Sequence, residues 1–209
     1  MSFESFLIEK FGEHEPKEID ELVLDDLIAN MGNLSEEHKK TLERYSNLIR
    51  LSMNNLGITS LTNFPSIVNL HVLEISLNCL TGEDFDKIPK LYPNLHKLKV
   101  TGNKIESIDV FKAISKTKIE RIETIENPFM EKNKKAEEQL FDMLGNVRVI
   151  NGHDRVGDII ESTDYDGEED EEDFDEEEYE DDAEDDEDFD FEDDEEEEED
   201  EKPKKKSKK

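Results

Sequence analysis

The residues best able to do chemistry in this chain are carboxylates. Between Asp164 and Glu201, 31 of 38 residues are Asp or Glu, and none is Lys or Arg. This run accounts for most of the formal net charge of −33. Adjacent carboxylates lie within the ~8 Å Debye length at physiological salt and repel one another, so the run is expected to be a disordered polyanion. Its chemistry is ionic, because carboxylates bind Arg and Lys through charge-assisted hydrogen bonds.

Aromatic side chains interrupt the acidic run, and each is flanked by acids. We expect these rings to enter apolar pockets of a basic partner while the neighbouring carboxylates meet its arginines. The alternative is chance variation in a low-complexity segment. The candidate anchors are Phe174, Tyr179, Phe189 and Phe191.

A candidate phosphorylation site lies at the start of the run. Thr163 is followed by acids at the first and third positions after it, as an acid-directed kinase requires. A phosphate on Thr163 would lengthen the polyanion by up to about two charges. The alternative is an unmodified linker threonine.

A lysine cluster follows the run. It is typical of a nuclear import signal read by an import receptor, and the alternative is a basic patch that folds back on the acids or touches nucleic acid. The adjacent polyanion disfavours direct nucleic-acid binding. The candidate import residues are Lys204, Lys205, Lys206, Lys208 and Lys209.

The usual catalytic arrangements are missing from the sequence. The five histidines lack metal-ligand spacing, no glycine-rich phosphate loop occurs, and Cys79 is the only cysteine. One cysteine permits neither an internal disulfide nor a cysteine-based zinc site, which suits a reducing compartment. No segment resembles a membrane span or a secretory signal. We therefore expect no enzyme activity, no cofactor and no membrane association.

A leucine-rich pattern precedes the acidic run. The motif L-x-x-L-x-L-x-x-N-x-L recurs every 22 to 25 residues, which is typical of leucine-rich repeats. In each repeat the fourth and sixth positions should face the core of a short strand, while their neighbours face the concave surface. The expected fold is an α/β leucine-rich repeat solenoid, with a curved parallel sheet, a helical or irregular convex side, and a cap at each end.

Two sets of polar residues occupy fixed positions in these repeats. Asparagines where the chain leaves each strand should form a buried ladder that pairs backbone groups of neighbouring repeats: Asn78, Asn103 and Asn127. Charged residues on the strands are candidate partner contacts: Glu74, Lys97, Lys99, Arg121 and Glu123. The alternatives are a solvated strand surface, or a basic surface that draws the acidic run inward.

The order of parts predicts four segments. Apolar residues at helical spacing predict an N-terminal capping helix within residues 1–18, and Pro16 is expected to stop this helix. About five repeats follow in residues 19–130. A C-terminal cap is expected over residues 131–158, and a disordered acidic tail ending in the lysine cluster over 159–209.

Several stretches of the chain resemble the acidic leucine-rich nuclear phosphoprotein 32 family. The resembling stretches are ELVLD from Glu21, GITSL from Gly57, YPNL from Tyr92, TGNKI from Thr101, and NGHDR from Asn151 before the acidic run. The combination of repeats, acidic tail and terminal lysines carries the resemblance. The chain departs from the family in its C-terminal cap, where Ala136-Glu137 replaces a usual Tyr-Arg pair and Leu144-Gly145 replaces Leu-Pro.

The resemblance implies a function. Proteins similar to this one are nuclear histone-binding and chaperone factors, mask histones from acetyltransferases, and in some members inhibit a serine/threonine phosphatase. We expect a non-enzymatic histone chaperone that binds core histones, mainly in the nucleus with shuttling to the cytoplasm. The alternative is a regulator of a phosphatase or acetyltransferase complex that docks through the repeats. A splicing-type scaffold is a third interpretation, which leaves the tail unexplained.

Overall fold

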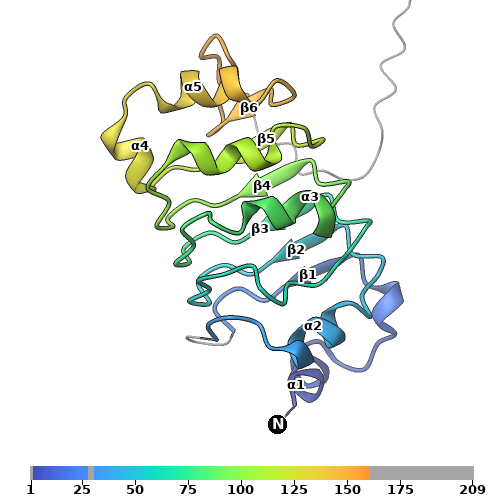
Figure 1. The fold of residues 1–209 in the computed structure, drawn as a ribbon. Helices are drawn as coiled ribbons and strands as arrows, with labels where there is room; N and C mark the ends of the chain where they lie inside the picture. Colours follow the sequence, from blue (N-terminus) through green and yellow to red (C-terminus); the bar gives the residue numbers. More distant parts are fainter. Residues whose placement is uncertain (1, 28–30, 161–209) are drawn as a thin grey trace, which may run out of the picture. The chain divides into compact units, whose positions relative to one another are not determined.

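The computed structural model describes residues 2–27 and 31–160 (Figure 1). The chain divides into two units, Met1–Glu169 and Asp170–Lys209, and the second lies wholly outside the described residues. No helix in the described part of the chain has the length and apolar character needed to cross a membrane.

The first unit is built on a sheet of six short parallel strands that follow one another in sequence order. The expected leucine-rich repeat solenoid is therefore confirmed. Each strand is joined to the next by a long return segment, as parallel pairing requires. The strands are β1 Glu21–Val23, β2 Arg50–Ser52, β3 Val72–Glu74, β4 Lys97–Lys99, β5 Arg121–Glu123 and β6 Val149–Ile150.

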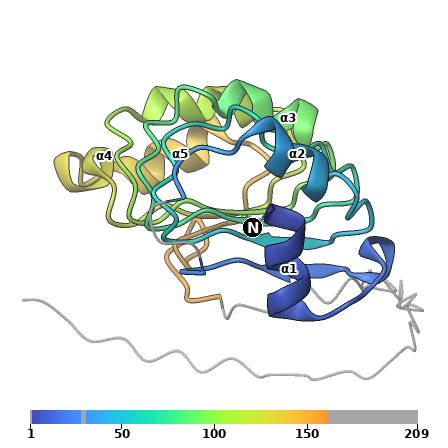
Figure 2. The same cartoon turned by 90° about the horizontal axis from the view of Figure 1, so that it is seen from below.

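Short helices occupy the return segments. Figure 2 shows α2, α3 and α5 on the opposite side of the molecule from the sheet. The α-helices are α1 Phe3–Phe11, α2 Glu36–Leu42, α3 Ile88–Leu91, α4 Pro128–Lys132 and α5 Ala136–Met143. Turns of 3-10 helix cover Pro16–Glu18, Phe85–Lys87 and Ile108–Ile114.

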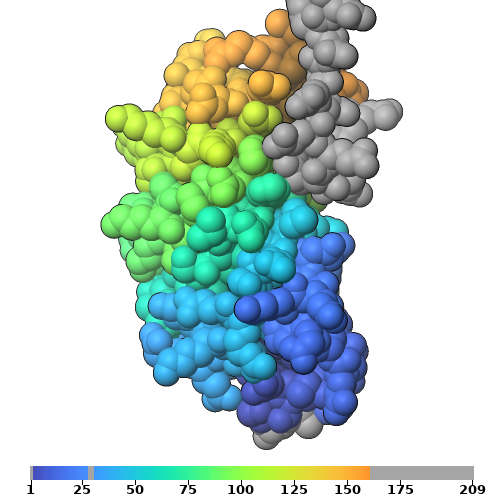
Figure 3. Space-filling model, turned by 90° about the vertical axis from the view of Figure 1, so that its right-hand side faces the viewer, coloured from blue at the N-terminus to red at the C-terminus, as the bar shows by residue number. Residues whose placement is uncertain are grey.

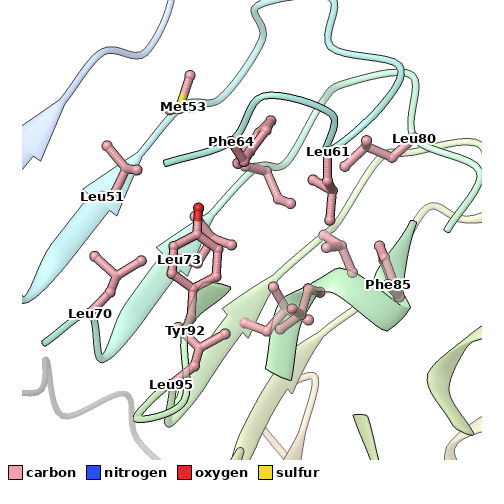
Figure 4. Packing of buried hydrophobic residues seen from close by; sticks show 14 of the residues in the cluster. Leu51, Met53, Leu61, Phe64, Leu70, Leu73, Leu80, Phe85, Tyr92 and Leu95 are labelled. Atoms are coloured by element: carbon pink, nitrogen blue, oxygen red, sulfur yellow. The ribbon is translucent and has the colours of Figure 1, made fainter. Parts of the chain in front are cut away.

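The core lies between the sheet and the return segments. Strand residues at the predicted inward positions are completely or almost completely buried, including Leu51, Leu73 and Leu98. Figure 4 shows Leu51 and Leu73 among side chains of the same buried cluster, with Tyr92 in front of Leu73. Each buried leucine stabilises the fold by about 2 kcal/mol relative to an exposed one, so the repeats hold one another together.

The N-terminal cap differs in detail from the sequence-based expectation. Helix α1 ends at Phe11, where Gly12 has a φ of 81° and donates its N–H to Ile8 O over 2.8 Å. Pro16 instead begins the first 3-10 helix, so the expectation that this proline stops the helix is wrong. Phe3 is buried, with its ring 4.6 Å from that of His38 on α2, whereas Phe11 is 43% exposed. The helix therefore packs on α2.

The C-terminal cap consists of α5 and the last strand, β6. Ala136 and Phe141 of α5 are buried, and the guanidinium of Arg155 lies 5.4 Å from the Phe141 ring centre. Arg155 also approaches Asp142 Oδ1 at 3.1 Å. Figure 3 shows one face of the molecule, along which the repeats follow in order from the N-terminal cap to the C-terminal cap.

Candidate functional site

The predicted charged residues stand in register on neighbouring strands. Lys97 on β4 is opposite Arg121 on β5, and Lys99 is opposite Glu123. Glu74 on β3 is opposite Lys99 in turn. The structure therefore brings all five candidate contact residues together on three adjacent strands.

These charges largely compensate one another. Lys99 Nζ lies 3.4 Å from Glu74 Oε1 and 3.7 Å from Glu123 Oε1, and Lys97 Nζ lies 3.8 Å from Glu123 Oε1. Arg50 of β2 completes the row, because its guanidinium lies 3.0 Å from Glu74 Oε1. Glu74 and Lys97 are also buried. The surface is thus a network of ion pairs rather than a basic patch. Lys97 and Lys99, which would have to attract the acidic run, are instead paired with carboxylates of the sheet.

The edge where the strands begin carries charges of both signs, since Asp20 and Glu120 directly precede β1 and β5 and Arg148 directly precedes β6. The rings of His71 and His96 meet edge to face with centres 5.0 Å apart. Burial, then His96 and Lys118, lower the pKa of His71. Arg148, 79% exposed at its side chain, is 4.0 Å from Glu120. His96, Lys118 and Arg148 line a hollow of about 380 Å³. The sequence contained a signal for this pair, because His71 and His96 each directly precede a strand.

The opposite edge, where the strands end, is apolar and acidic. We define the strand-end rim as Leu77, Gly102, Ile125 and Glu126, which lie in the turns after β3, β4 and β5. Leu77 is 53% and Ile125 48% exposed. Leu77 and Glu126 have φ values of 55° and 58°, in the left-handed region that L-residues rarely adopt. Sequence analysis did not identify this rim.

Buried asparagines join the repeats at this same edge. Asn103 Oδ1 accepts the N–H of Leu80 over 3.0 Å, and its Nδ2 donates to Ile75 O and Val100 O over 3.0 Å each. Asn78 and Asn127 make corresponding bonds one repeat earlier and one repeat later. Their role is structural, because they satisfy buried backbone groups of adjacent turns.

A second row of asparagines, which the sequence analysis missed, connects the returns near the strand starts. Each donates its Nδ2 to a carbonyl of the preceding repeat. The pairs are Asn47 to Lys17 O at 2.8 Å, Asn69 to Ser46 O at 3.1 Å, Asn94 to Val68 O at 3.1 Å and Asn146 to Thr117 O at 2.7 Å. The sequence signal was an asparagine directly before the first apolar position of these repeats.

The remaining predicted site residues lie outside the described part of the chain. They are the aromatic anchors Phe174, Tyr179, Phe189 and Phe191, the phosphorylation candidate Thr163, and the import lysines Lys204, Lys205, Lys206, Lys208 and Lys209.

The described residues offer binding surfaces and no assembled metal centre. Within residues 2–27 and 31–160, no group of three or more His, Cys, Asp or Glu side chains is placed to hold a metal ion. Cys79 is a free, partly buried thiol.

Comparison with known proteins identifies relatives by sequence and by fold. No family model matches the chain. It is 33% identical over 154 residues to the acidic leucine-rich nuclear phosphoprotein 32-related protein of Plasmodium falciparum (isolate 3D7), which covers 73% of this chain and 54% of that protein. The chain thus spans about half the length of this relative. A chain in the crystal structure of the Drosophila melanogaster SNF/U2A' complex matches 64% of this chain and 73% of its own length, at 18% identity and a TM-score of 0.52. This second likeness concerns the fold alone.

Proposed function

This chain is homologous to the acidic leucine-rich nuclear phosphoprotein 32 family, and we propose that it is a non-enzymatic nuclear protein that binds core histones as a chaperone. The observation that carries the proposal is the run of 31 carboxylates in 38 residues. Residues 1–163 hold 28 acids and 20 bases, and several of these pair with one another on the sheet. Most of the excess negative charge therefore belongs to the acidic run.

The acidic run supplies rate and strength of binding. A polyanion attracts a basic protein from a distance and raises the association rate, while its carboxylates bind arginines and lysines that would otherwise contact DNA. In this proposal the run covers the DNA-binding surface of a histone until DNA replaces it. Phosphate on Thr163 would add charge at the start of the run.

The aromatic residues in the run would supply specificity. Charge alone attracts any basic protein, whereas a ring that fills an apolar pocket requires a matching surface. We propose that Phe174, Tyr179, Phe189 and Phe191 make such contacts. The lysine cluster from Lys204 to Lys209 would be read by an import receptor, which places the chain in the same compartment as its partner.

A competition experiment tests the chaperone proposal. Core-histone pairs and duplex DNA are mixed at about 150 mM salt, where screening beyond ~8 Å weakens diffuse attraction, and the full chain is then added. The full chain should release histones from non-specific DNA complexes, and a chain ending at residue 160 should release far fewer. Histone–DNA complexes that persist unchanged with excess full chain would contradict the proposal.

The runner-up function, a regulator of a phosphatase or acetyltransferase complex, is favoured by a different observation. Leu77 and Ile125 are large apolar side chains exposed at one edge of the sheet. Exposed apolar residues on a repeat surface are typical of protein docking. An enzyme inhibited equally by the full chain and by the chain ending at residue 160 would support this second function, because histone shielding requires the acidic run.

A further inference from the structure

The turns of the strand-end rim are joined directly to one another. Leu77 donates its N–H to Thr101 O over 2.8 Å, and Gly102 donates its N–H to Ile125 O over 2.9 Å. Three consecutive turns therefore lie side by side at strand spacing, so Leu77 and Ile125 are separated by about 10 Å. This is the width of a contact made by one or two side chains of a partner.

Gly102 lets an apolar group and a carboxylate meet at the middle of the rim. A Cβ placed on Gly102 would lie 2.7 Å from Leu77 Cδ2 and 3.5 Å from Glu126 Oε2. Any larger residue at this position would push Leu77 aside. The two side chains consequently lean over the same backbone position, one from each neighbouring turn.

Leu77 occupies a turn position at which each of these repeats has a positive φ, because Asp26, Asn55, Gly102 and Glu126 stand at the same place after β1, β2, β4 and β5. Its φ of 55° is disfavoured for every residue with a Cβ except, to a lesser extent, Asn and Asp. Its side chain is nevertheless 53% exposed, so burial recovers only part of this cost. The repeat turn itself imposes this conformation, and Leu77 is the only large apolar residue at this position in the turns after β1 to β5.

The charge at the edge where the strands end indicates which kind of partner segment binds there. The turns after β1 to β5 contain Asp25, Asp26 and Glu126, and none of their residues (24–27, 53–56, 75–78, 100–103 and 124–127) is Lys or Arg. The opposite edge carries Lys118 and Arg148 but also Asp20 and Glu120, so its charge is mixed. The turns at the strand ends are negative, and Glu126 brings this charge to the strand-end rim, which favours a basic segment there.

We propose that the strand-end rim binds a lysine or arginine side chain of a core histone, as a second contact in addition to that made by the acidic run. This inference rests on the proposed function. Lysine and arginine combine an aliphatic stem with a cationic head. The stem would lie on Leu77 and Ile125, and the head would meet Glu126. The folded repeats then hold the histone at a fixed point while the acidic run covers it.

A triple variant of the full chain tests the rim. Leu77→Asn, Ile125→Ser and Glu126→Gln remove its two apolar groups and its charge, all at exposed positions. A matched control combines Val68→Ser, Val156→Ser and Glu106→Gln, which are exposed on other surfaces and change the charge equally. The probe is a recombinant core-histone dimer at about 150 mM salt, a concentration that screens exposed charges beyond ~8 Å.

The expected result is about tenfold weaker binding by the rim variant and unchanged binding by the control, as for loss of one anchoring contact. In the parent chain, the methyl resonances of Leu77 and Ile125 should shift on titration with the dimer. Equal affinities of parent, rim variant and control, or unshifted methyl groups, would overturn the rim proposal while leaving histone binding intact. Failure of the parent itself to bind the dimer would overturn the proposed function and the rim proposal with it.

Discussion

Glu74 Oε1 lies 3.4 Å from Lys99 Nζ, so a buried carboxylate on β3 is held by an ammonium group on β4. The same oxygen lies 3.0 Å from the Arg50 guanidinium on β2. One carboxylate thus joins three strands. Buried charges are tolerated only when they are paired, and without Glu74 the ammonium of Lys99 would keep only Glu123 and the guanidinium of Arg50 only Glu21.

Glu74→Gln should destabilise the fold by about 1–3 kcal/mol, because the substitution leaves two partly buried cations facing a neutral amide. Urea unfolding at neutral pH, with the slope checked against the parent, measures the change. Glu106→Gln is the control, because its ion pair with Lys132 is exposed on both sides and should cost less than about 0.5 kcal/mol. Equal losses of stability in the two variants would mean that the ion pairs of Glu74 stabilise the fold no more than an exposed surface pair does.

Asn103→Ala should destabilise the protein by about 2 kcal/mol or more. The substitution leaves the buried N–H of Leu80 without its partner, which costs about 1–3 kcal/mol, and removes one of the two amide hydrogen bonds at Ile75 O and at Val100 O, which keep those from Asn78 and Asn127. The same urea measurement applies. The comparison is Asn69→Ala, whose single exposed bond to Ser46 O should be worth about 1 kcal/mol or less. A smaller loss for Asn103 than for Asn69 would refute the structural role of the buried ladder.

His71 makes the stability of the fold depend on pH. Burial, then His96 and Lys118, hold its pKa below the ordinary value of 6.5. Between these two pKa values the unfolded chain binds a proton that the folded chain does not, so the free energy of unfolding falls as the pH drops below 6.5. His71→Gln should therefore lose less stability than the parent between about pH 7.5 and 5.5.

The pH experiment compares urea unfolding midpoints across this range. His153→Gln serves as the control, since His153 is exposed. The parent and this control should show the same decline, whereas His71→Gln should show a shallower one. Three parallel curves would show that His71 titrates alike in the folded and unfolded chains.

Leu77→Asn should raise the melting temperature. Asparagine accepts the left-handed conformation more readily than leucine, and relief of this strain is worth up to about 1 kcal/mol. Ile125→Asn also removes an exposed apolar side chain, but Ile125 has no positive φ, so its effect should stay within about 0.5 kcal/mol. A lower melting temperature for Leu77→Asn would mean that packing of Leu77 over Gly102 outweighs the strain.

The repeat period was enough to predict the sheet and the buried ladder. Leu51, Leu73 and Leu98 had to face the core once the period was known, because side chains alternate along a strand. Asn103 was predictable for a related reason: an amide at a fixed position after a buried strand can satisfy backbone groups of the next repeat.

Contacts between side chains of different repeats were not predictable from one sequence. The pairing of Glu74 with Lys99, and the burial of Lys97, depend on strand register and on the conformations of long side chains. The left-handed φ of Leu77 also escaped prediction, since leucine is not a turn residue. The end of α1 was misplaced because Gly12 ends the helix before Pro16 can.

Calorimetry with each of the two kinds of core-histone pair tests the central claim most directly. The full chain, residues 1–160 and residues 161–209 are compared at about 150 mM salt, where charges farther apart than ~8 Å are screened. The account predicts tight binding of one preferred pair by the full chain, loss of most affinity without residues 161–209, and weaker binding by residues 161–209 alone. Binding by residues 1–160 that equals binding by the full chain, or no binding by any of the three, would contradict it.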